Sequence, residues 1–205
     1  MRSASDCDSP SSEKKMTTNP QDTARQKELV VNALYSHFFG DPELNLYAVL
    51  DGASIPDLLE HLEEEKPESV CLYRGELSED LASAAPYLVH ITPDTPFTEW
   101  LLLEGWGNHW GIFVLTKGDL KETRKHFRTF LLVKDPEGRQ IYFRFYDPRV
   151  LRTFIPIATS EQVAQITGLL EKILFEAEDR QNMQSISRHT NWKLESSALM
   201  GGTFQ

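Results

Sequence analysis

The residues best placed for chemistry are four charged side chains next to apolar sequence. Arg144, Asp147 and Arg149 stand close together, and Asp51 directly follows a short apolar run. A carboxylate that meets a histidine in the fold can act as a general acid or base, so a hydrolase using Asp51 or Asp147 with a histidine is one hypothesis. Paired charges at the ends of helices and strands more often fix local geometry. We therefore interpret these four residues as scaffold.

Other patterns of catalysis are missing from the sequence. The six histidines are scattered, none pairs with another at metal-ligand spacing, and there is no Cys-x-x-Cys or His-Glu-x-x-His. The chain also lacks a Gly-x-Ser-x-Gly elbow, a phosphate-binding loop and a dinucleotide fingerprint. We predict a protein that is not an enzyme and that uses no metal and no cofactor.

Two tryptophans and one basic helix are candidates for contact with a partner. Trp106 stands between two glycines in a predicted loop, and Trp110 begins the next predicted strand. A loop tryptophan either covers the core or anchors a partner, and the sequence leaves both open for Trp106. In the predicted helix 119–129, the side opposite the apolar residues carries four basic residues: Lys121, Arg124, Lys125 and Arg128.

Charge is distributed unevenly along the 205 residues, whose formal net charge is -10. An acidic chain repels phosphate backbones, which argues against nucleic acid as a partner. Residues 57–80 contain nine Asp/Glu and two Lys/Arg, whereas residues 117–152 contain ten Lys/Arg and five Asp/Glu. Each run alone is typical of a solvated surface. Together, one acidic and one basic region suit docking of two different protein partners.

Strand and helix signals alternate through most of the chain, which predicts an α/β protein with a mixed β-sheet covered by helices. Asp147 can cap a helix over 149–155, with Pro148 in its first turn. Just before it, aromatic residues on both sides of 140–146 predict a central strand covered on two faces. The predicted helices are 29–38, 55–65, 78–84, 97–104, 119–129, 149–155 and a short one from 159, and the predicted strands are 46–50, 70–73, 87–91, 110–115, 130–134, 140–146, 173–176 and 183–187.

Composition divides the chain into three parts. Residues 1–19 are polar and rich in Ser and Asp, which predicts a disordered N-terminal extension. Residues 20–189 form the folded domain, with a possible smaller C-terminal lobe from about 148, and 190–205 are predicted to be a flexible tail. Residues 1–15 show no apolar signal core, and no apolar run is long enough to span a bilayer, so we expect a cytoplasmic protein with no membrane contact.

Four segments in order resemble a known family. They are Leu46-Tyr47-Ala48-Val49-Leu50-Asp51-Gly52-Ala53, Ala85-Pro86-Tyr87-Leu88-Val89, Trp110-Gly111-Ile112-Phe113 and Arg144-Phe145-Tyr146-Asp147-Pro148-Arg149-Val150-Leu151. In this order they are similar to the type VI secretion effector adaptor/chaperone family, the VgrG-associated adaptors of the Tap/Tec type. The resemblance covers roughly residues 28–180.

This resemblance implies a function and a set of signature positions. Members of the family bind the N-terminal segment of a toxic effector and help load it onto the VgrG spike, without enzymatic activity or cofactor. The implied signature positions are Asp51, Gly52, Arg144, Asp147, Pro148 and Arg149. Two departures from the family pattern are the polar N-terminal extension and the short C-terminal end, where the resemblance leads us to expect a longer helical region in some relatives. The alternative from another class is an immunity protein, an acidic plug that neutralises a basic toxin.

Overall fold

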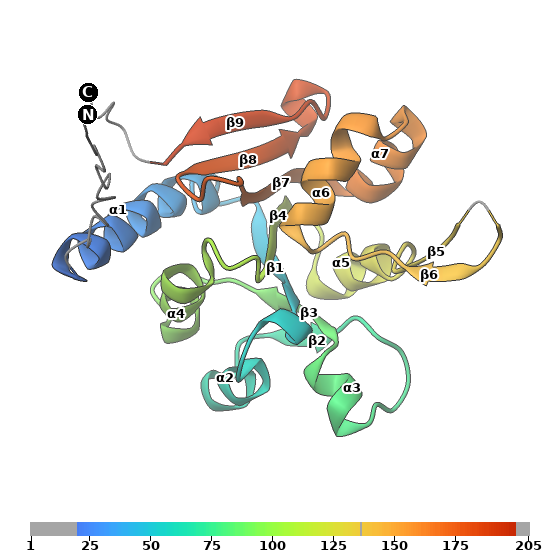
Figure 1. Ribbon diagram of the computed structural model, residues 1–205, viewed down its shortest axis with the longest axis horizontal. Helices are drawn as coiled ribbons and strands as arrows, with labels where there is room; N and C mark the ends of the chain where they lie inside the picture. The colour runs from blue at the N-terminus through green and yellow to red at the C-terminus, as the bar shows by residue number, and fades with distance from the viewer. Residues whose placement is uncertain (1–19, 136, 200–205) are drawn as a thin grey trace, which may run out of the picture.

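A single large sheet organises the structure, a computed structural model that describes residues 20–135 and 137–199 (Figure 1). The sheet has seven strands in the order β2-β3-β1-β4-β7-β8-β9, and every pairing in it is antiparallel. Its strands are β1 (Asn45–Asp51), β2 (Ser69–Cys71), β3 (Pro86–His90), β4 (Gly111–Thr116), β7 (Leu170–Glu176), β8 (Asn182–Ser187) and β9 (Glu195–Ala198).

Helices cover both faces of this sheet, and a small ribbon stands apart from it (Figure 1). The ribbon is the antiparallel pair β5 (Leu132–Lys134) and β6 (Gln140–Tyr142). The α-helices are α1 (Pro20–Phe38), α2 (Leu58–Glu65), α3 (Glu79–Ser83), α4 (Pro96–Gly105), α5 (Leu120–Phe127), α6 (Pro148–Phe154) and α7 (Ser160–Thr167), and the 3-10 turns are η1 (Gly52–Ser54), η2 (Ile155–Ile157) and η3 (Arg188–Thr190).

Alternation along β1 shows why the sheet has an apolar core on each side. Leu46, Ala48 and Leu50 pack into the cluster that includes residues of α1, α2 and α4. Tyr47 and Val49 pack into the other cluster, with residues of α5, α6 and α7. Because successive side chains of a strand point to opposite faces, a strand that is apolar at nearly every position is buried on both sides. The predicted α/β class, with helices over a sheet, is confirmed.

Local capping signals mark several helix starts correctly. Thr95, Asp119, Asp147 and Thr159 each accept a backbone N–H of the first turn of α4, α5, α6 and α7. Short polar side chains at these positions satisfy donors that have no partner inside the helix. The helix predicted from 55 is different: it begins at Leu58, because the Ser54 hydroxyl donates to Asp51 at 2.6 Å instead of capping a helix.

The strand predicted over 140–146 is the largest correction. β6 ends at Tyr142 and belongs to the two-stranded ribbon, where Ile141 and Tyr142 are exposed. The chain then turns across the core, and the adjacent residues Phe145 and Tyr146 are both buried. Residues 143–147 have no strand conformation and pair with no strand of the main sheet, so no central strand forms here.

Three further expectations need correction. The sheet is antiparallel throughout the described residues, whereas a mixed sheet was predicted, because alternating strands and helices need not be parallel crossover units. The residues after 148 form no separate lobe, since β7 pairs with β4 in the main sheet. Within the predicted tail 190–205, β9 pairs with β8, whereas 200–205, like 1–19, lie outside the described residues. None of the helices described here is long and apolar enough to cross a membrane.

Candidate partner-binding site

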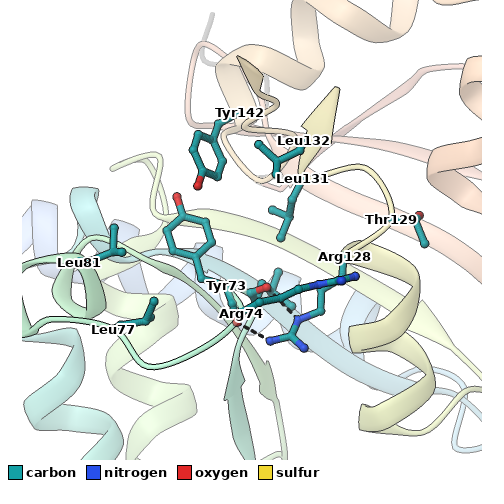
Figure 2. A pocket seen from close by; sticks show the side chains of 10 residues that line it. Tyr73, Arg74, Leu77, Leu81, Arg128, Thr129, Leu131, Leu132 and Tyr142 are labelled. Atoms are coloured by element: carbon teal, nitrogen blue, oxygen red, sulfur yellow. Dashed lines mark hydrogen bonds between the residues drawn. The ribbon is translucent and has the colours of Figure 1, made fainter. Parts of the chain in front are cut away.

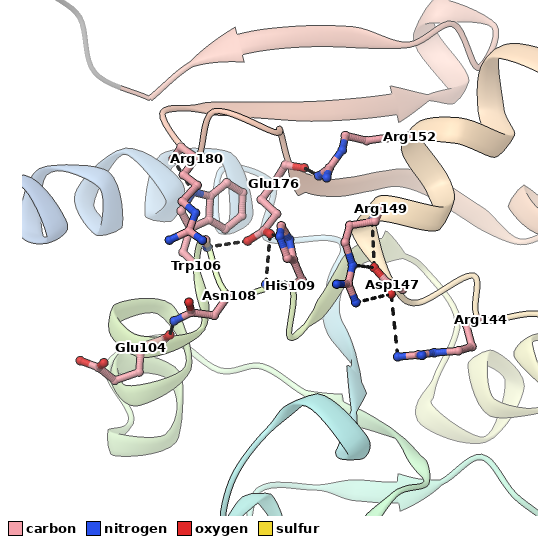
Figure 3. A network of polar contacts seen from close by, with 11 residues as sticks. Glu104, Trp106, Asn108, His109, Arg144, Asp147, Arg149, Arg152, Glu176 and Arg180 are labelled. Carbon is pink, nitrogen blue, oxygen red and sulfur yellow. Dashed lines mark hydrogen bonds and ion pairs between the residues drawn. The ribbon is translucent and has the colours of Figure 1, made fainter.

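The signature residues come together in one charged cluster where β1 ends and α6 begins. Arg144 forms an ion pair with the Asp51 carboxylate and lies 3.8 Å from Asp147. Arg149 holds Asp147 with two parallel contacts, Nε to Oδ1 at 2.9 Å and Nη2 to Oδ2 at 2.8 Å (Figure 3). Both carboxylates are buried, while the two arginines are 43% and 52% exposed. Arg144 therefore lies next to both carboxylates, and the arginine itself is half-exposed.

Gly52 and Pro148 have structural reasons for their residue types. A Cβ on Gly52 would lie 2.5 Å from the carbonyl oxygens of Ser83 and Ala85, so a side chain would collide with backbone. Pro148 occupies the first turn of α6, where a helix needs no N–H. The cluster therefore joins β1, the loop before β3 and α6, as scaffold residues would.

The Asp147 carboxylate gives the fold a predictable response to acid. Burial raises the pKa of Asp147, but the hydrogen bonds from Arg149 and the charges of Arg149 and Arg144 outweigh it, so the pKa lies below its ordinary value of 3.8. A depressed pKa contributes stability that is present above the ordinary value and is lost as pH falls through the folded one. We expect Asp147→Asn to lower the free energy of unfolding at neutral pH, and the difference from wild type to shrink below about pH 4.

Urea unfolding of both proteins between neutral pH and about pH 3 measures this difference. Asp94→Asn is the control, because Asp94 is exposed and forms no ion pair within the described part of the chain. A difference between wild type and Asp147→Asn that stays constant with pH would contradict the assignment.

A second carboxylate, Glu176 at the end of β7, holds the loop between α4 and β4. Glu176 is 3% exposed; it accepts the backbone N–H groups of Gly107 and His109 and forms an ion pair with the His109 ring (Figure 3). Burial raises the pKa of Glu176, while the charge of His109 and the two N–H groups oppose this effect. Gly107 and His109 both have positive φ, so the carboxylate stabilises a loop conformation that is otherwise unfavourable.

The two tryptophans of this loop lie mainly against the core. Trp106 is half-buried, packs on the sheet face covered by α1 and α4, and donates from Nε1 to the Arg180 carbonyl at 3.1 Å. It also lines a pocket of about 350 Å³ beside α1, so part of its surface remains open. Trp110 packs against Trp100, with ring centroids 5.1 Å apart and the rings tilted by 44°, and its ring lies directly against Gly105. The geometry gives both residues a packing role: Trp110 lines only the small cavity beside Glu176, whereas Trp106 also borders the pocket beside α1.

The hydrolase hypothesis requires a histidine beside Asp51 or Asp147, and the structure places arginines there instead. Asp51 and Asp147 contact arginines, and no described histidine pairs with either. His109 does meet a carboxylate, Glu176, but the cavity beside that carboxylate measures only about 10 Å³. Glu176 was not identified from the sequence, and it is 67 positions away from His109, so no local signal marks the pair. Among the described residues, no three His, Cys, Asp or Glu side chains gather as metal ligands would.

An open groove of about 380 Å³ with several apolar lining residues lies beside the ribbon (Figure 2). One wall comes from the segment after β2 and from α3, and the other from the end of α5 and the ribbon. The groove residues are Leu72, Tyr73, Arg74, Leu77, Leu81, Arg128, Thr129, Leu131, Leu132 and Tyr142. Its size is within the range of ligand-binding pockets.

Exposed apolar side chains gather at this groove. Of the eight large hydrophobic residues exposed in the described chain, Leu81, Leu132 and Tyr142 line it, with 45%, 47% and 60% of their surface accessible. Leu132 and Tyr142 are direct cross-strand partners, so both side chains lie on the same face of the ribbon. Tyr142 faces Tyr73 of the opposite wall, with ring centroids 5.4 Å apart. Exposed apolar side chains that gather at one groove make it the candidate surface for contact with another chain.

The basic helix α5 borders the groove at one end. Its buried residues are Thr123 and Phe127, as predicted, and its basic residues lie on the other sides. Arg128 lines the groove and binds the backbone of the opposite wall: its guanidinium donates to the carbonyls of Cys71, Leu72 and Tyr73. Lys121 and Arg124 line a neighbouring pocket of about 250 Å³, and Lys125 is exposed. Of the four basic residues singled out from the sequence, the structure places only Arg128 in the groove.

Comparison with known families gives one match. Residues 46–165 match the family described as "Domain of unknown function (DUF4123)". This span includes the whole signature cluster and every residue of the groove. No curated protein and no solved structure matches the chain.

Proposed function

Because this chain belongs to the DUF4123 family, which is associated with effector adaptors of type VI secretion, we propose that it is such an adaptor. It holds the N-terminal segment of an effector in the groove beside the ribbon and helps to load that effector onto the VgrG spike. It works in the cytoplasm, without cofactor, catalysis or nucleic acid. The observation that carries the proposal is the open groove with three exposed apolar side chains inside the family span.

The ribbon adds a physical argument for an occupant. Each of its strands has three residues, and an isolated two-stranded ribbon of this length is marginal in water. It is anchored at its base, where the Phe143 N–H donates to the Leu131 carbonyl. Covering Leu132 and Tyr142 with an apolar segment removes their surface from water, at about 25 cal/mol per Å². The same contact shields an effector segment that would otherwise aggregate.

Binding to the effector encoded beside this chain tests the proposal. We expect co-purification with the effector's N-terminal region and not with its catalytic domain. The variant Leu132→Ser/Tyr142→Ser should bind about tenfold more weakly, because it removes apolar contacts at the centre of the groove. Ile157→Ser is the matched control, since Ile157 is 80% exposed and lies on η2, outside the groove.

Two results would contradict the adaptor. One is an effector that is equally soluble and equally loaded on the spike when this chain is deleted. The other is protection of cells from the catalytic domain alone, which is the result expected of an immunity protein.

A further inference from the structure

Four basic residues form a ridge that runs from the groove along α5: Arg74, Lys121, Arg124 and Arg128. Lys121, Arg124 and Arg128 are spaced three and four positions apart, which places them on one side of the helix. Figure 2 shows Arg74 and Arg128 next to each other on the groove wall. Burial and the charges of Arg124 and Arg74 lower the pKa of Arg128, as expected where cations crowd together.

The ridge has no acidic partner within the described residues. None of the ion pairs found there involves any of its four members. The Arg124 Nε is buried and makes no hydrogen bond. Arg128 uses Nε and Nη2 on backbone carbonyls, which satisfy donors but bring no negative charge. Crowded cations with an unsatisfied donor are a ready site for carboxylates.

Three acidic residues lie near the ridge: Glu68, Asp119 and Glu122. Glu68 lines the same pocket as Lys121 and Arg124, and its carboxylate lies 3.5 Å from the His90 ring. The Asp119 carboxylate accepts the Glu122 N–H, and the Glu122 carboxylate accepts the Asp119 N–H, so both carboxylates are hydrogen-bonded at the start of α5. Glu79 and Asp80 lie in the first turn of α3, on the other wall. The charged residues that line the groove itself are Arg74 and Arg128, and both are basic, which favours an acidic occupant.

We propose that the segment held in the groove is acidic as well as apolar. This inference rests on the proposed function and specifies its ligand: apolar side chains pack on Leu81, Leu132 and Tyr142, and Asp or Glu side chains of the same segment bind the basic ridge. Each carboxylate then meets basic side chains that form no ion pair within residues 20–135 and 137–199.

Two synthetic peptides test the charge of the ligand directly. They share the same Leu and Phe positions and differ only in carrying Glu or Lys between them. We expect the Glu peptide to bind wild-type protein at least about tenfold more tightly at low salt, and the advantage to fall as salt is added, because screening weakens exposed charge pairs.

Charge reversal on the ridge should reverse this preference. Arg74→Glu/Arg124→Glu is the test variant, and Arg74→Gln/Arg124→Gln is its milder form should the first fail to fold. Arg128 is left in place because it holds the backbone after β2. Arg25→Glu/Lys193→Glu is the control: it changes the net charge equally at exposed positions away from the groove.

The outcomes separate this inference from the function on which it rests. Equal binding of the two peptides, preference for the Lys peptide, or a preference unaffected by the ridge variants would overturn the acidic ligand. If the effector segment still binds and its binding depends on Leu132 and Tyr142, the proposed adaptor function is supported while the acidic-ligand inference is contradicted. If neither the effector segment nor either peptide binds, both the proposed function and the acidic-ligand inference are contradicted.

Discussion

Arg144→Met is expected to lower the free energy of unfolding by about 3 kcal/mol, more than Asp51→Asn at the other end of the same ion pair. The reason is the unequal burial of the two partners: Asp51 is 1% exposed and Arg144 is 43% exposed. Removing the arginine leaves a buried carboxylate with only the Ser54 hydroxyl as a side-chain partner. Removing the charge of Asp51 leaves an arginine that water can reach.

A double-mutant cycle measures this asymmetry. Asp51→Asn should cost less than Arg144→Met, and the double variant should be more stable than Arg144→Met alone, since the unpaired buried charge is gone. Arg139→Met is the control, because Arg139 also loses ion pairs, with Asp135 and Glu137, but is 74% exposed. That change should cost at most about 0.5 kcal/mol. Strict additivity in the cycle would contradict a stabilising role of the Arg144–Asp51 pair. So would an equal loss of unfolding free energy in Arg144→Met and Arg139→Met.

The sequence predicts those parts of the fold whose signals are local. A cap such as Asp119 with Glu122 acts within one turn of helix, so both the element and its start can be read from neighbouring residues. The ribbon shows the limit. Aromatic residues after Tyr142 predict a longer strand, but which of them are buried depends on how the chain crosses the core, and that is decided by distant residues.

The edge strand β9 could not be predicted from the sequence for a related reason. β9 has the sequence Glu-Ser-Ser-Ala, with only one residue that is not fully exposed, so no apolar alternation marks it. Its strand conformation comes from hydrogen bonds to β8 rather than from its own composition. A polar edge also discourages pairing with another chain, which makes such strands hard to distinguish from loops in a sequence.

Local sequence signals identify one part of the candidate site, the signature cluster, but not the other part, the groove. The signature cluster could be found because three of its residues stand within one segment and the fourth, Asp51, follows an apolar run. The groove could not, because Leu81 and Tyr142 meet only after β2, α3, α5 and the ribbon have assembled. Arg128 was identified through its helix, yet its contact with the carbonyls of 71–73 had no counterpart in the sequence pattern.

Substitution of Glu176 is expected to cause the second large loss of stability. Glu176→Leu should lower the free energy of unfolding by about 3 kcal/mol, because the backbone N–H groups of Gly107 and His109 lose their acceptor in a buried place. The cavity of about 10 Å³ beside the carboxylate leaves little room for a water molecule to replace it. The loop that carries Trp106 would then lose the contact that fixes its two residues of positive φ.

Glu176→Gln distinguishes the two roles of the carboxylate. Glutamine keeps one acceptor oxygen but points an NH2 group at a backbone donor, so it should recover only part of the stability. Glu104→Gln is the matched control: Glu104 lies at the end of α4 and forms only an exposed pair with Lys27, so its loss should cost at most about 0.5 kcal/mol. Urea unfolding followed by tryptophan fluorescence reports the stability and the combined environment of the four tryptophans, Trp106 among them. Were Glu176→Leu as stable as Glu104→Gln, with unchanged fluorescence, the carboxylate would not be what holds the loop, and Trp106 would be positioned by its bond to Arg180 and its packing on the sheet alone.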